Sequence, residues 1–122
     1  MKIKTSEATP RQLDWLVAKL EFDAPAIHGG VVHAMHEYMP WAPSTDWNHG
    51  MPIVERECMA SSCFAPLPES MHYDPANPTR KQWFFWTGKT GMVAGPTLLI
   101  AAMRCYVASK LGDEVDVPEE LT

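Results

Sequence analysis

A run of basic residues is the first thing this sequence lacks. Its 122 residues include 10 Lys and Arg against 15 Asp and Glu, which gives a formal net charge of −5. Lys and Arg supply most of the affinity of nucleic-acid-binding proteins by neutralising phosphates, and they usually form a basic stripe. The charge balance therefore argues against DNA or RNA as a partner.

Long apolar runs and paired cysteines are also lacking. No stretch of about 18 apolar residues is present to span a bilayer, and residues 1–5 lack the apolar region of a signal peptide. The 3 cysteines are an odd number without the spacing of a disulfide framework. We therefore expect a cytosolic protein with reduced thiols and no membrane partner.

No catalytic motif has the required spacing. Gly88-Lys89-Thr90 resembles the end of a phosphate-binding loop, but the position that needs the first glycine is Trp83, so a hairpin turn is favoured. The Gly-x-Ser-x-Gly motif that carries the nucleophile of many serine hydrolases is missing, and no carboxylate pair is placed for acid–base chemistry. Cys105 lies on an apolar helix face, where a buried thiol is more common than a nucleophile. The sequence predicts no catalytic residue.

Metal ligands are present without a workable arrangement. His33 and His36 would point to opposite faces of a strand, so they could chelate an ion only if the segment were helical. Cys58, Cys63 and His72 have irregular spacing. We expect neither a metal nor a cofactor.

Helical periodicity is present in three segments. Thr9-Pro10 begins an amphipathic pattern over 10–21, and a second apolar pattern over 96–111 ends at Gly112, where a glycine cap belongs. Ser44-Thr45-Asp46 is a cap cluster for a helix over 45–57. Gly50 and Pro52 interrupt that helix, so we expect a kink or a break.

Strands are expected between the helices. Gly29-Gly30 predicts a hairpin turn between strands over 25–28 and 31–38. The aromatic segment 81–86 predicts a central strand, which residues 92–94 pair with after a turn over 88–91. Residues 58–79 read as loop with a possible strand at 59–65.

These elements predict a single α+β domain over 1–122, in which a small, mainly antiparallel sheet packs with about three helices. Residues 113–122 are acidic and contain Pro118. We expect them to form a loosely attached tail.

Several blocks, spread along almost the whole chain, are specific in combination. They are Met-Lys-Ile-Lys-Thr-Ser-Glu at 1–7, Leu13-Asp-Trp15, Val17-Ala-Lys19, Pro43-Ser-Thr-Asp-Trp47, Pro52-Ile-Val-Glu-Arg-Glu57 and the segment Gly95–Glu114. Together these blocks resemble the NinX-like proteins of lambdoid phages. The order of helix, Ser-Thr-Asp cap and Ala-rich terminal helix is similar, less closely, to the phage ABA sandwich domain. The resemblance implies a small α+β accessory protein that works in the cytosol of an infected bacterium, and it carries over no catalytic residue, because it implies no reaction.

The sequence offers one candidate ligand site, around the cap cluster. Free N–H groups of a helix start attract anions, and tryptophan faces stack on planar bases. The alternative interpretation is structural, with a helix cap and one tryptophan that closes the core. The predicted ligand-binding residues are Trp41, Ser44, Thr45, Asp46 and Trp47, with Arg104 as the cationic partner.

Two classes of function follow. The first is a non-catalytic binding protein that sequesters a nucleotide-type host immune signal or docks on a host protein. The alternative is a small hydrolase acting on a nucleotide, which would require a cleft gathering His, Asp and Glu. Five tryptophans are many for one small core, so we also expect a homo-oligomer.

Overall fold

The structure is a computed structural model of the chain, and it describes residues 1–22, 25–33, 40–61, 65–66, 72–73, 81–87 and 91–121. Three sequence predictions lie partly outside these residues: the end of the strand over 31–38, most of the loop over 58–79, and the turn at 88–90. The side chains named above that also lie outside are those of His36, Cys58, Cys63, His72 and Trp83.

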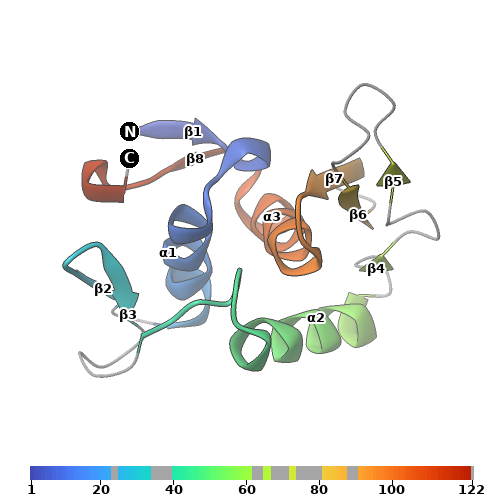
Figure 1. The fold of residues 1–122 in the computed structure, drawn as a ribbon, viewed down its shortest axis with the longest axis horizontal. Helices are drawn as coiled ribbons and strands as arrows, with labels where there is room; N and C mark the ends of the chain where they lie inside the picture. The colour runs from blue at the N-terminus through green and yellow to red at the C-terminus, as the bar shows by residue number, and fades with distance from the viewer. Residues whose placement is uncertain are drawn as a thin grey trace.

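In the described part of the chain, three α-helices form the centre of the fold: α1 (Pro10–Glu21), α2 (Trp47–Ser61) and α3 (Leu98–Leu111). Helices α1 and α3 lie side by side, and α2 lies below α3 in the view of Figure 1. Thr9 and Gln12 form the reciprocal capping box of α1, and the Thr97 side chain caps α3. Gly112 ends α3 with a φ of 94°, a conformation that favours glycine. None of the described helices is long and apolar enough to cross a membrane.

The strands form three small antiparallel groups around these helices (Figure 1). The predicted two-glycine hairpin pairs β2 (Ala26–His28) with β3 (Val31–His33). Strand β6 (Lys81–Thr87) is central, as predicted, because it pairs with β4 (Ala65–Pro66), β5 (His72–Tyr73) and β7 (Gly91–Gly95). These elements confirm the α+β class. Two short 3-10 helices, η1 (Thr5–Glu7) and η2 (Glu119–Leu121), lie near the chain ends.

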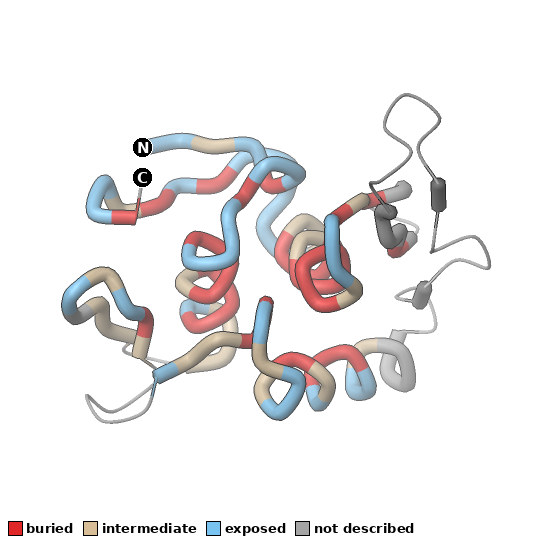
Figure 2. The backbone as a smooth tube through the Cα atoms, viewed as in Figure 1, coloured by how far each residue is buried: buried red, intermediate tan, exposed pale blue. Residues whose placement is uncertain are grey.

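The hydrophobic core lies where α1, α2 and the sheet meet α3. Leu13 and Leu16 of α1, Ile53 of α2 and Phe85 of β6 all belong to one buried cluster. Figure 2 shows that the buried positions of α2 face α3, while its exposed positions face away. Cys105 belongs to the same cluster, which confirms that its thiol is a buried small side chain.

Helix α2 differs from the prediction. The expected end at 57 is wrong, because the helix continues to Ser61. Of the expected kink or break, the break is wrong, because the helix runs on through Pro52. Pro52 leaves the carbonyl of Asn48 without its usual helical donor, but Asn48 is exposed and water can bind that carbonyl. A Cβ on Gly50 would clash with the Pro43 carbonyl and would lie 2.8 Å from Leu99 Cδ2. Glycine at position 50 therefore serves close packing.

The C-terminal segment also differs from the prediction. Strand β8 (Glu114–Asp116) pairs with β1 (Lys2–Lys4), so the expected loosely attached tail is wrong. Gln12 of α1 donates to the Leu121 carbonyl at 3.2 Å, which fastens the segment to the first helix. Its acidic residues face solvent, while its alternate apolar residues enter the core (Figure 2). Those buried residues are Val115, Val117 and Leu121.

Candidate functional site

Ser44 anchors the predicted site to α1. Its backbone N–H donates to Asp14 Oδ1 at 3.0 Å, and its Oγ lies 2.7 Å from the same oxygen and 3.1 Å from the Pro10 carbonyl. Burial raises the pKa of Asp14 to about 6, against the lowering effect of the bonds from Ser44. Ser44 is buried, so its hydroxyl holds the loop in place rather than facing a ligand.

Asp46 caps α2. Its Oδ1 accepts a 2.9 Å hydrogen bond from the N–H of Asn48, and its carbonyl accepts from His49 and Gly50. The carboxylate therefore occupies part of the helix N-terminus that the anion-binding prediction had left open. His49 Nδ1 accepts a 3.1 Å hydrogen bond from the N–H of Ala42, which ties the start of the helix back to the loop.

A small cavity of about 170 Å³ lies between the first turns of α2 and α3. We call it the Trp47 slot. Trp47, the first residue of α2, lines it with 55% of its surface exposed. Thr97, the cap of α3, lines the opposite helix start. The slot combines predicted and unpredicted residues, which are Ser44, Thr45, Trp47, Thr97, Leu99 and Ile100.

Trp41 and Arg104 are not among the residues that line the slot. Trp41 packs edge-on against Phe22 and stacks on His49, with ring centroids 4.8 and 5.1 Å apart. Arg104 donates to the carbonyls of Ala8 and Ala94 at 2.9–3.2 Å, and burial lowers its pKa. Trp41 therefore packs against two other rings, and Arg104 joins two separate parts of the backbone. Of the predicted set, the structure brings together only Ser44, Thr45 and Trp47, with Asp46 beside them.

A larger hollow of about 400 Å³ lies at the other end of α3, and we call it the terminal hollow. Its walls come from β1, η1, β7, the last part of α3 and β8. None of the predicted site residues lines it. Sequence reasoning missed it because it treated 113–122 as a tail. The lining residues are Lys4, Thr5, Ser6, Val93, Ala94, Ala108, Asp113 and Glu114.

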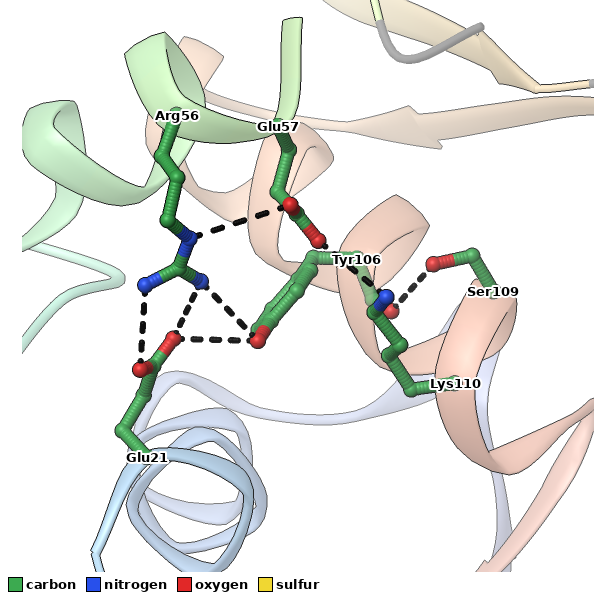
Figure 3. Close-up of polar contacts among 6 residues, drawn as sticks. All are labelled: Glu21, Arg56, Glu57, Tyr106, Ser109 and Lys110. Carbon is green, nitrogen blue, oxygen red and sulfur yellow. Dashed lines mark hydrogen bonds and ion pairs between the residues drawn. The ribbon is translucent and has the colours of Figure 1, made fainter. Parts of the chain in front are cut away.

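A polar network joins all three helices (Figure 3). The Arg56 guanidinium donates two hydrogen bonds to the Glu21 carboxylate and one, at 3.1 Å, to the Tyr106 hydroxyl. Burial raises the pKa of Glu21, but the bonds from Arg56 and Tyr106 outweigh it and hold the pKa below its usual value. Glu57 and Lys110 form a further ion pair beside this network, at 3.4 Å. The charged groups satisfy one another, so the network serves as a clamp between helices.

Comparison with known proteins gives the family. The model of the family described as "Bacteriophage P22, NinX" matches residues 4–110, which include α1, α2 and all of α3 except its last residue, and stop before β8. No curated protein sequence matches the chain closely enough to add a second comparison. The match agrees with the blocks noted in the sequence and extends across most of the chain. This phage accessory protein belongs to the NinX family.

Proposed function

We propose that the protein is a non-catalytic binding protein that docks on a host protein through the Trp47 slot, in the cytosol of the infected bacterium. The observation that carries this proposal is the size of the slot beside an exposed tryptophan. A cavity of about 170 Å³ is below the roughly 300–1,000 Å³ of small-molecule sites. It suits one apolar side chain of a partner, inserted as an anchor.

The rim of the slot supports docking as well. Trp47 is 55% exposed, although a tryptophan used only for core packing would be buried. Exposed tryptophans are enriched among the residues that dominate the affinity of protein interfaces. Asp14 holds Ser44 in place from α1, so the slot is preorganised and loses little entropy when a partner binds.

Two alternatives receive less support. Sequestering a nucleotide would use the helix starts as an anion site, but the Asp46 carboxylate already binds the N–H of Asn48. A hydrolase working at the Trp47 slot would need an accessible acid or base there, whereas the nearby carboxylate of Asp14 is buried against Ser44. Docking accounts for the exposed tryptophan and for the small cavity together.

Site-specific photo-crosslinking tests this proposal. The photoreactive amino acid p-benzoylphenylalanine is placed at Thr45, which is exposed beside the slot, in bacteria expressing the protein. We expect one discrete crosslinked species, identified by mass spectrometry, that disappears when Trp47 is changed to Ala. Loss of such an anchor lowers affinity by about 30-fold, which corresponds to roughly 2 kcal/mol.

Leu111→Ala is the matched control, because Leu111 is also a large exposed apolar residue (44%) but does not line the slot. This variant should retain the crosslink. A species of twice the chain mass would identify a second copy, as the homo-oligomer prediction requires, in place of a host protein. If the same crosslinked species forms when Trp47 is changed to Ala, docking at the slot is contradicted.

A further inference from the structure

The terminal hollow combines a polar rim with an apolar floor. Val93 and Ala94 of β7 and Ala108 of α3 supply apolar surface, while Ser6 adds an exposed hydroxyl. Thr5 is buried in its wall, where its hydroxyl donates to the Gly112 carbonyl at 2.7 Å. The volume of the terminal hollow, about 400 Å³, lies within the range of small-molecule sites, whereas the volume of the Trp47 slot lies below it.

Three charged side chains line the hollow, and all three are exposed: Lys4, Asp113 and Glu114. Lys4 and Glu114 lie directly opposite each other in the β1–β8 ladder. Within the described part of the chain, no ion pair and no side-chain hydrogen bond involves any of the three. One ammonium and two carboxylates are therefore available to a ligand.

The backbone fixes these charges on a rigid frame. The N–H of Thr5 donates to the Asp113 carbonyl at 2.8 Å, next to the last pair of the β1–β8 ladder. Arg104 joins the carbonyls of Ala8 and Ala94, which holds the chain after η1 against β7. The two long walls of the hollow are thus fastened to each other at one end by the half-buried guanidinium of Arg104.

We infer that the terminal hollow binds a small amino-acid-like zwitterion with an aliphatic body. Asp113 and Glu114 bind its ammonium group, Lys4 binds its carboxylate, and Val93, Ala94 and Ala108 contact its apolar part. A ligand with only a negative charge would be attracted by one ammonium group but repelled by two carboxylates, so it would bind poorly. A ligand with only a positive charge would leave Lys4 without a counter-ion. This inference is independent of docking at the Trp47 slot, because the two cavities share no lining residue.

A matched series of three probes with the same aliphatic body tests the charge requirement. L-Leucine carries both charges, 3-methylbutylamine carries only the ammonium, and 4-methylpentanoate carries only the carboxylate. Each is titrated into the ¹⁵N-labelled full chain, and the amide shifts of Val93, Ala94 and Ala108 are followed. An exposed ion contact changes affinity by up to about five-fold. We expect leucine to bind about five-fold more tightly than the amine, and the carboxylate to bind weakest.

Variants assign each charge. Lys4→Met should lower the affinity for leucine about five-fold and leave that for the amine unchanged, whereas Glu114→Gln should lower both. The controls are Lys2→Met and Asp116→Asn, which change the paired charges one step away on the same strands and outside the hollow. They should leave all three affinities unchanged.

Three outcomes overturn the inference. The first is that none of the three probes shifts the amides that line the hollow. The second is that all three bind equally, which would mean that only the aliphatic body is recognised. The third is that Lys2→Met weakens leucine as much as Lys4→Met does, which would show a general effect of charge. Amide spectra of the free variants verify that each remains folded.

Discussion

The two ends of α3 are built differently. At its N-terminal end, the Trp47 slot is small and apolar, and it is formed by a loop that α1 holds through Asp14 and Ser44. At its C-terminal end, the terminal hollow is larger, carries free charges, and is formed by strands from both ends of the chain. The first end suits a side chain of a partner protein, and the second suits a small polar ligand. Opposite ends of one helix thus present different chemistry.

Removing residues 113–122 should have the largest effect on stability. It would also remove Asp113 and Glu114 from the terminal hollow, and with them one side of the comparison between the two ends of α3. It deletes β8 and three buried side chains, each worth roughly 1.5–3 kcal/mol. We expect the free energy of unfolding to fall by more than about 4 kcal/mol, a large part of the stability of a domain. Urea unfolding followed by circular dichroism measures it. A Glu120→Ala control should unfold at the same urea concentration as the native protein. If the truncated chain is as stable as this control, residues 113–122 are loosely attached after all.

Gly50→Ala tests the close packing at the slot end. Alanine usually favours a helix by about 1 kcal/mol over glycine. Here its Cβ would meet the Pro43 carbonyl and Leu99, so we expect a loss of roughly 1–3 kcal/mol instead. Thermal unfolding measures the change, and Asn48→Ala, at an exposed position of the same helix, is the control. A stabilised Gly50→Ala protein would show that the slot wall has room to move.

Asp14→Asn sharpens the comparison, because it removes a charge from the anchor of the slot but keeps an oxygen for Ser44. The pKa of Asp14 is about 6 in the folded protein and ordinarily near 3.8, so folding favours its protonated form. Its contribution to stability is greatest below pH 4 and is lost as the pH rises through 6.

The variant should therefore be more stable than the native protein at pH 8, by roughly 1–3 kcal/mol, and this difference should shrink near pH 4.5. Urea unfolding at the two pH values measures it. Asp46→Asn, at the half-buried cap beside the slot, is the control. A variant that is less stable at pH 8 would mean that the negative charge itself holds the loop.

Trp47→Ala should have the smallest effect on folding. More than half of the side chain is exposed, so we expect a loss of about 0.5 kcal/mol or less. Trp41→Ala is the contrasting variant, because its ring packs on Phe22 and His49 and should cost roughly 3 kcal/mol. Thermal unfolding compares the two. A large loss on Trp47→Ala would mean that this tryptophan stabilises the fold rather than serving a partner.

Local patterns predicted the helices and the main strands because their signals are short-range. The capping box of Thr9 and Gln12 and the glycine end of α3 are formed by residues a few positions apart. The pairing of β1 with β8 depends on residues more than 100 positions apart, which no local pattern reports. The many acidic residues of 113–122 also made the alternation of the buried Val115 and Val117 with exposed residues hard to recognise.

The candidate site was predicted in part for the same reason. Ser44, Thr45 and Trp47 were placed together by their neighbourhood in the sequence, and they do line one slot. Arg104 was chosen from its position on a helix face, but its partners are carbonyls of Ala8 and Ala94, which no local pattern identifies. The opposite wall of the slot, at Thr97 and Leu99, likewise required the tertiary fold.

The β1–β8 ladder has a consequence for how the protein is made. Strand β1 is synthesised more than 100 residues before the partner strand that it needs, which lies in residues 114–116. Until those residues emerge, β1 has no partner strand, and the Met1 amino group cannot reach the Val117 carbonyl that it binds at 3.0 Å. The helices can form earlier from local contacts, but the pairing of β1 with β8 must await residues 114–116. The terminal hollow, which Glu114 of β8 helps to line, therefore takes shape after the helices during synthesis.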